Sequence, residues 1–169
     1  MGKIAIIFGS STDNTASAAK KIAEKLSNKD VTVIDVAKLK TADSLSEYAG
    51  LILGTSTMGL GDLQDDWDGY VSQLKKADLS GKTVALFGLG DSASYSDTFV
   101  DGMGILFEAV KGSAAKVVGR VPSNEYSFDS STALDGDEFV GLPLDDDNES
   151  DLTDKRITSW VAQIDSYFA

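Results

Sequence analysis

Apolar residues in this chain fall into short continuous runs, and most runs are followed by a stretch in which apolar residues recur at helical spacing. Residues 4–8 are all apolar, as is typical of a strand buried on both faces of a sheet. Residues 15–26 then place one apolar face on a helix, formed by Ala19, Ile22, Ala23 and Leu26. Further strands are predicted at 31–34, 50–54, 83–87 and 115–118, and further helices at about 65–75, 99–110 and 153–168.

This alternation predicts an α/β fold, namely a doubly wound, five-stranded parallel sheet with helices on both faces. No internal repeat or domain boundary is evident, so residues 1–169 are expected to form a single domain. Residues 120–138 are rich in Ser and Asp, and we predict that they are an insertion in the fifth strand, followed by an apolar run at 139–142. Thr153 or Asp154 is the expected cap of the last helix.

The amino-acid composition excludes several kinds of catalytic and metal chemistry. The chain has no cysteine and no histidine, which removes disulfides, thiolate nucleophiles, iron–sulfur ligation and the usual general base together. No metal site and no catalytic residue is predicted. Any chemistry is expected to come from carboxylates, hydroxyls, backbone groups or a bound cofactor.

The net charge limits the classes of molecule that can bind this protein. The formal net charge is −12, with nine acidic and no basic residues between Asp135 and Asp154 and a second acidic group at Asp62, Asp65, Asp66 and Asp68. Nucleic acid and anionic membranes are therefore poor partners, whereas basic protein surfaces are good ones. No apolar run approaches the roughly 20 residues of a membrane span, and the start of the chain does not resemble a signal peptide, so we expect a cytoplasmic monomer.

Three loops that follow predicted strands are unusual, and in an open parallel sheet ligands bind at such strand ends. The first loop, Gly9 to Thr15, joins a strand to a helix start and is rich in hydroxyl groups. Free N–H groups and the helix dipole favour an anion there, and a cap needs only one hydroxyl. The loop lacks the lysine of a P-loop and the spacing of a dinucleotide-binding turn. A capped helix start with surplus hydroxyls is the alternative.

The other two loops are rich in glycine. Residues 55–62 place Met58 in a polar stretch and bracket Leu60 between two glycines, and residues 88–95 end in Tyr95. Glycines let the backbone approach a planar ligand, and an aromatic side chain stacks on one. The alternatives are a flexible connection with Met58 as a gap-filler and a Tyr95 that covers the edge of the core. Together the three loops predict a mononucleotide site with a stacked ring.

Several motifs in this order resemble the flavodoxin family, of the long-chain type, over essentially the whole chain. They are Ile7–Thr12 with Asn14 and Thr15, Leu53–Thr57, Ala85–Asp91 with Tyr95, Phe139–Leu142, Leu144–Asn148, Leu152–Asp154 and Trp160. The resemblance implies the strand order 2-1-3-4-5, for which flavodoxin itself is a standard illustration. It also implies a low-potential, one-electron carrier that holds FMN without a covalent bond and works between redox proteins rather than as an enzyme. A flavodoxin reductase and a low-potential acceptor are the implied partners.

Carried onto this sequence, the resemblance implies a cofactor site in which the first loop holds the phosphate, Tyr95 stacks on the outer face of the ring and Met58 lies on the inner face. The residues implied are Ser10, Ser11, Thr12, Asp13, Asn14, Thr15, Ser56, Thr57, Met58, Gly59, Leu60, Gly61, Leu89, Gly90, Asp91, Tyr95, Thr98 and Asp147. Asp147 is expected near the ribityl chain.

Two residues depart from the family pattern. Asp13 stands where relatives often have glycine, and its carboxylate repels a phosphate unless it turns outward or caps the helix. Met58 stands where relatives often have tryptophan, and Met58 with Gly59, Leu60 and Gly61 is similar to flavodoxins that serve nitrogen fixation, so nitrogenase is one acceptor that the resemblance suggests.

Three alternatives remain open from the sequence. An FMN-dependent reductase would oxidise a nicotinamide donor without a partner protein. A phospho-acceptor signalling domain would need an acidic pair after the first strand, where this chain has Gly9 and Ser10. An interaction module with the same fold and no cofactor would show no flavin absorbance.

Overall fold

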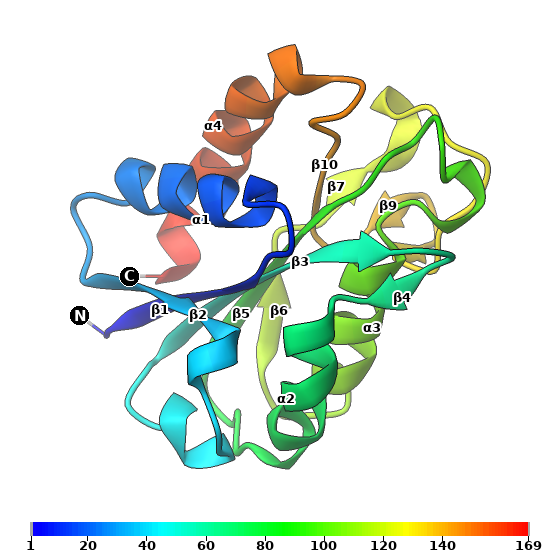
Figure 1. The fold of residues 1–169 in the computed structure, drawn as a ribbon. Coiled ribbons are helices and arrows are strands. Elements are labelled where there is room, and N and C mark those ends of the chain that lie inside the picture. The colour runs from blue at the N-terminus through cyan, green and yellow to red at the C-terminus, as the bar shows by residue number, and fades with distance from the viewer. Residues whose placement is uncertain (1, 169) are drawn as a thin grey trace.

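The computed structural model describes residues 2–168. They form one central sheet that has helices on both faces (Figure 1). The strands are β1 (Ile4–Gly9), β2 (Val31–Asp35), β3 (Gly50–Met58), β4 (Asp62–Leu63), β5 (Thr83–Leu89), β6 (Lys116–Val118), β7 (Val121–Pro122), β8 (Leu134–Asp135), β9 (Glu138–Phe139) and β10 (Leu142–Leu144). The α-helices are α1 (Asn14–Lys25), α2 (Asp65–Lys76), α3 (Asp101–Val110) and α4 (Thr153–Ile164). Within these residues no helix has the length and apolar character that a membrane crossing needs.

The main sheet runs β10-β5-β3-β1-β2, and all of these neighbours are parallel. Strand β6 pairs with the first half of β5, from Thr83 to Ala85, and β10 pairs with the second half, from Phe87 to Leu89. The predicted interruption of the fifth strand is therefore confirmed, and the order agrees with the one that the flavodoxin resemblance implies. Short β4 adds an antiparallel hairpin to the end of β3.

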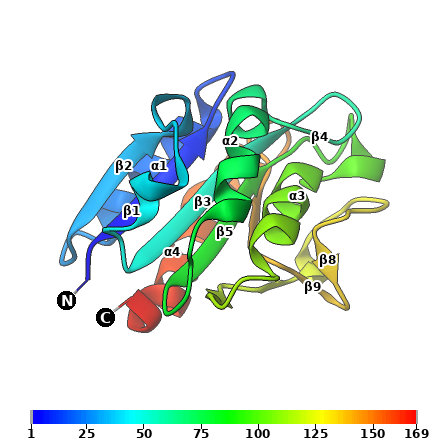
Figure 2. The ribbon, with the colours of Figure 1, turned by 90° about the horizontal axis from the view of Figure 1, so that it is seen from below.

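Two helical layers explain the continuous apolar runs. Ile4 and Ile6 of β1 pack with α1 and α4 on one face of the sheet, whereas Ala5 and Ile7 pack in the core that contains residues of α2 and α3. Figure 2 shows α2 and α3 lying across the sheet on the side nearest the viewer. Because helices cover both faces of β1, every side chain at these positions is buried. The strand is therefore continuously apolar, without the alternation of apolar and polar residues found in strands that have one face in solvent.

The insertion forms a small sheet of its own. Strands β7, β9 and β8 pair antiparallel, next to α3 and away from the centre of the main sheet (Figure 2). Phe139 belongs to this sheet and packs against Phe99, Tyr126 and Phe128 with ring centroids 5.2–5.9 Å apart. The apolar run at 139–142 is thus divided: its first part completes an aromatic cluster, and the interrupted strand resumes only at Leu142.

Two local predictions differ from the structure. Thr55 to Met58, predicted as loop, continues β3 because the neighbouring β5 and β4 supply hydrogen-bonding partners on that stretch. The cap predicted for α4 is wrong as well. A 3₁₀ turn at Ser150–Leu152 runs directly into the helix, Leu152 takes the N-cap position without a side-chain cap, and Thr153 Oγ1 donates to the Asp146 carboxylate.

Candidate functional site

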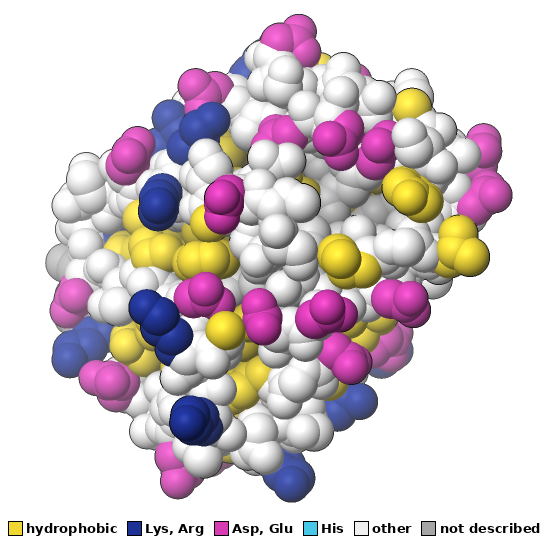
Figure 3. Space-filling view, in the orientation of Figure 1, with side chains coloured by type: hydrophobic (Ala, Val, Ile, Leu, Met, Phe, Trp, Pro, Cys, Tyr) yellow, Lys and Arg dark blue, Asp and Glu magenta, His cyan; other side chains and the backbone are white. Residues whose placement is uncertain are grey.

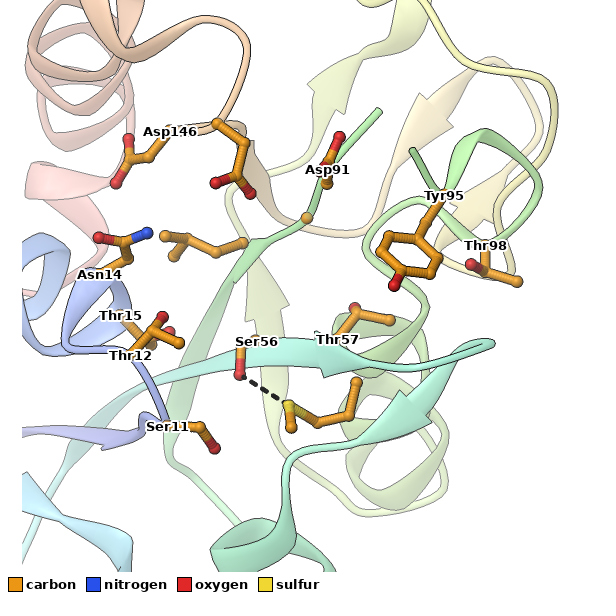
Figure 4. Close-up of a pocket in the computed structure, with 14 residues that line it drawn as sticks. Ser11, Thr12, Asn14, Thr15, Ser56, Thr57, Asp91, Tyr95, Thr98 and Asp146 are labelled. Atoms are coloured by element: carbon orange, nitrogen blue, oxygen red, sulfur yellow. Dashed lines mark hydrogen bonds between the residues drawn. The ribbon is translucent and has the colours of Figure 1, made fainter. Parts of the chain in front are cut away.

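A pocket of about 250 Å³ lies at the carboxyl ends of the central strands, which is where ligands bind in open α/β sheets. In Figure 4 the hydroxyl-rich loop after β1 and the Tyr95 side chain stand at opposite ends of this pocket. The residues that line it come from four separate segments, and they are Ser11, Thr12, Asn14, Thr15, Ser56, Thr57, Met58, Leu89, Gly90, Asp91, Tyr95, Thr98, Asp146 and Asp147.

The loop after β1 is built to receive an anion. Helix α1 begins at Asn14, its first turn contains no acidic residue, and no side chain caps it. The N–H groups of that turn therefore point toward the pocket end of the helix without an intrahelical partner. Asp13, in the N-cap position, has a left-handed backbone (φ 67°), a conformation that glycine adopts without strain. The Asp13 side chain is exposed and does not line the pocket.

The Ser10 hydroxyl is a second indication that this loop suits an anion. Its hydroxyl oxygen is buried and makes no hydrogen bond within residues 2–168. A buried hydroxyl without a partner costs about 1–3 kcal/mol, so such a group marks a place where a ligand atom or a water satisfies it. Ser11 and Thr12 next to it are exposed, and both line the pocket. The residues present therefore fit a phosphate group.

The end of β3 forms the floor of the pocket. Ser56 and Thr57 both line it, with their side chains on opposite sides of β3 (Figure 4), and the Ser56 hydroxyl lies 3.9 Å from the Met58 sulfur. Thr57 Oγ1 also accepts from the Gly102 N–H at 2.9 Å, which ties the floor to the start of α3. Gly59 and Gly61 make the hairpin to β4 with φ angles of +50° and +103°, and Leu60 between them is 85% exposed. This hairpin presents an apolar side chain beside the pocket.

The turn after β5 forms the wall that carries Tyr95. Asp91 Oδ1 accepts from the Ala93 N–H at 3.2 Å and the Ser94 N–H at 2.9 Å, and the Asp91 carbonyl accepts from Tyr95 N–H at 2.9 Å. These contacts close a compact turn. Tyr95 remains 46% exposed, so one face of its ring is free to cover a planar ligand.

The insertion supports this wall from behind. The Ser96 carbonyl accepts from the Asp129 and Ser130 N–H groups at 2.9 and 3.0 Å, and the Ser96 hydroxyl donates to the Asp129 carboxylate at 2.7 Å. Ser131 Oγ donates to the Phe99 carbonyl at 2.5 Å. Residues 129–131 therefore hold the segment that immediately follows Tyr95. This support is a structural role of the insertion that could not be predicted from its sequence.

Carboxylates surround the pocket. Hydrogen bonds from the Ser94 N–H and the Asn148 side chain lower the pKa of Asp91. Burial raises the pKa of Asp147, and Asp91, Asp145 and Asp146 raise it further by charge repulsion. In Figure 3 acidic side chains gather around the hollow in this face, while the basic side chains in view lie away from it. The rim is therefore strongly negative, and it disfavours additional negative charge in the pocket.

Most of the predicted site residues meet in this pocket, but five do not line it. Ser10 has its hydroxyl buried within the loop, Asp13 is exposed beside the helix start, and Gly59, Leu60 and Gly61 form the hairpin beyond Met58. All of the other predicted residues line the pocket.

Three nearby residues escaped prediction. Asp146 lines the pocket, and the acidic run from Asp145 to Asp147 was the available signal for it. Gln64 is 1% exposed; its Oε1 caps α2 by accepting from the Asp66 and Trp67 N–H groups, and its Nε2 lies 3.3 Å from the Ser11 hydroxyl. Glutamine is not a usual cap, so no sequence signal marked it. Asp145, the third, is fully buried next to Asp146.

Comparison with known proteins gives a consistent result. The flavodoxin family model matches residues 6–160. The chain belongs to the flavodoxin family. It is similar to the flavodoxin of Helicobacter pylori, with 43% identity over 100% of both chains, and to that of a Nostoc species, with 45% identity over 98% of this chain and 97% of the relative.

Solved flavodoxins have the same fold. A flavodoxin of Fusobacterium nucleatum, determined with flavin mononucleotide bound, superposes with a TM-score of 0.94 at 28% identity and covers 100% of both chains. A flavodoxin of Bacillus cereus, solved in the oxidised form, gives a TM-score of 0.76 at 25% identity over 99% of this chain. Membership of this family thus accounts for the doubly wound sheet.

Proposed function

We propose that this chain binds FMN non-covalently and carries single electrons between redox proteins. The observation that carries the proposal is the anion cradle after β1, where an uncapped helix start and the unpaired Ser10 hydroxyl lie at one end of a pocket and Tyr95 lies at the other. An anion cradle at one end of a pocket and an aromatic side chain at the other suit a flavin mononucleotide, and the related Fusobacterium flavodoxin was solved with this molecule.

In this proposal the residues act by binding and orienting. Ser10, Ser11, Thr12, Asn14 and Thr15 hold the phosphate through hydroxyl and N–H donors. Tyr95 and Met58 cover the two faces of the ring, and Asp147 and Asp146 lie toward the ribityl chain. When bound, FMN supplies the one-electron chemistry, and the protein supplies position and electrostatics. The carboxylates at the rim oppose added negative charge and so favour a low potential.

The partners follow from the charge. The acidic rim favours docking to basic redox proteins, such as a flavodoxin reductase as donor and a low-potential protein as acceptor. Nitrogenase is one candidate acceptor, suggested by Met58 and the Gly59-Leu60-Gly61 hairpin. We further propose that the chain is a single cytoplasmic domain. We also propose that it is a monomer, since residues 2–168 expose few large apolar side chains, namely Leu60, Tyr95 and Tyr167.

The decisive experiment is the spectrum of the purified protein. We expect a yellow protein whose flavin absorbance survives dialysis, and an apo-protein that regains it with FMN but binds riboflavin, which lacks the phosphate, far more weakly. A colourless protein that does not take up FMN would reject the proposal. Turnover of NAD(P)H without a partner protein would instead favour the reductase alternative, and we expect none.

A further inference from the structure

One buried carboxylate near the pocket has no direct place in the proposed cofactor contacts. Asp145 follows β10 and is 0% exposed, yet within residues 2–168 no lysine or arginine forms an ion pair with it. Burying a charge is costly unless hydrogen bonds compensate for it. The reason that Asp145 is tolerated must therefore lie in the groups that donate to it.

These donors come from two loops. From the loop after β5, Ser92 donates to Asp145 Oδ2 through its N–H at 3.2 Å and also through its hydroxyl. From the loop after β10, Asn148 donates through its N–H at 3.1 Å and through its side-chain amide at 3.0 and 3.1 Å. Ser92 and Asp145 are 53 residues apart in the sequence, so this contact joins two independent segments.

The same network reaches the pocket. The Asn148 amide donates to Asp91 Oδ1 at 2.8 Å, and that same Asp91 oxygen also accepts from the Ser94 N–H in the turn that leads to Tyr95. Asp91 and Tyr95 line the pocket from one loop, and Asp146 and Asp147 line it from the other. Asp145 itself does not line the pocket.

We infer that Asp145 is a positioning residue that locks the loop bearing Tyr95 to the loop bearing Asp147 and so sets the geometry of the ring-binding wall. This inference rests on the proposed function, because the wall is defined by the flavin that it would hold. A carboxylate suits the task since it is acceptor-only and receives donors from both sides. An amide at this position would turn an N–H₂ group toward donors.

The main test compares Asp145→Asn with Asp151→Asn. Asp151 is exposed, and its substitution removes the same charge from the same acidic run without touching the network. Two quantities are measured: hydrogen exchange of the Ser92, Ser94 and Asn148 amides in the apo-protein, and the dissociation constant of FMN. For D145N we expect at least tenfold faster exchange at these amides and at least tenfold weaker binding of FMN. For D151N we expect both quantities to stay within twofold of wild type.

A second variant separates geometry from charge and covers the case in which D145N does not fold. Ser92→Ala removes one donor and leaves the carboxylate in place. We expect about fivefold weaker binding of FMN and a measurable shift in at least one reduction potential, with little change in the urea midpoint of the apo-protein. The effects of S92A and D145N should also be less than additive, because both break the same link.

The outcomes distinguish the two proposals. If wild-type protein does not bind FMN, the proposed function fails, whatever the exchange data show. If wild type binds FMN but D145N and S92A leave its affinity, the potentials and the loop exchange unchanged, Asp145 is a purely structural residue and the inference is overturned.

Discussion

The two ends of the pocket are built in different ways. The phosphate end is one continuous stretch, Ser10 to Thr15, whose donors are set by a strand end and a helix start that are adjacent in the sequence. The ring end is assembled from the ends of β3, β5 and β10, and distant contacts hold it, including Ser92 to Asp145 and Ser96 to Asp129. Local structure therefore determines the first end, and tertiary contacts determine the second.

This difference has a consequence for mutations. A substitution at the phosphate end acts directly on the ligand, because the side chains and N–H groups there have few other partners. A substitution at the ring end acts through the position of a loop, so its effect depends on how many other hydrogen bonds still hold that loop. Substitutions at both ends of the pocket can test this contrast.

The largest effect is expected at Thr12. Thr12→Glu places a carboxylate in the anion cradle, and two unit charges about 5 Å apart repel by about 3 kcal/mol at an effective dielectric constant of about 20. We expect FMN to bind about 100-fold more weakly, while the affinity for riboflavin, which carries no phosphate, changes little. Ser17→Glu, exposed on the next turn of α1 and outside the pocket lining, is the matched control. Equal loss for both flavins would contradict a phosphate site.

Substitutions at Gly59 test how the backbone at the ring end affects the reduction potentials. We expect the Gly59–Leu60 peptide to need two orientations as the cofactor is reduced. The φ of +50° costs a β-branched residue about 1–2 kcal/mol, although no atom within 3.4 Å would obstruct a Cβ. Gly59→Val should change the gap between the two one-electron potentials by about 40–90 mV, whereas Gly59→Asn, which tolerates this backbone, should change it less. Redox titration measures both, and an unchanged gap in G59V would contradict the prediction.

Asp13 tests whether strain or charge matters more at the phosphate end. Asp13→Gly removes both the left-handed strain and the carboxylate, and Asp13→Asn removes only the charge. We expect D13G to raise the free energy of unfolding of the apo-protein by about 0.5–1 kcal/mol and D13N to raise it less. Both should tighten FMN binding by a similar, few-fold factor. A gain in affinity in D13G alone would show that the backbone conformation, rather than the charge, limits binding.

Asp62 tests the electrostatics of the rim. It lies opposite Met58 in the β3–β4 hairpin and is exposed. A carboxylate about 8 Å from a reduced ring would lower its potential by at most about 90 mV at an effective dielectric constant of about 20, and solvent and salt reduce this value. We expect Asp62→Asn and Asp65→Asn to raise the second potential by a few tens of millivolts at low salt. No change at low salt would reject the idea.

The smallest effect is expected at Asp147. Burial and neighbouring carboxylates raise its folded-state pKa above the ordinary value of 3.8, so its ionisation disfavours the folded apo-protein at neutral pH. Asp147→Asn should therefore raise the urea midpoint at pH 7, and the gain should vanish as the pH falls below 3.8, where wild type is protonated in both states. A gain that persists at low pH would show that charge is not its cause.

The architecture and an anion site in the first loop could be predicted from the sequence alone. Continuous apolar runs indicate strands that are covered on both faces, and the hydroxyl-rich loop between a strand and a helix indicates an anion site, because both signals depend on residues close together in the chain. The same local logic located the insertion, and the order of the motifs supplied the resemblance to the flavodoxin family.

The contacts that hold the ring end became visible only in the folded chain. The link from Asp145 to Ser92, the cap that Gln64 provides beside Ser11, and the support of Ser96 by residues 129–130 join segments that the sequence leaves far apart. A hydrogen bond between distant residues leaves no spacing pattern in a single sequence. For the same reason the extension of β3 to Met58 and the division of the 139–142 run became visible only once neighbouring strands were in place.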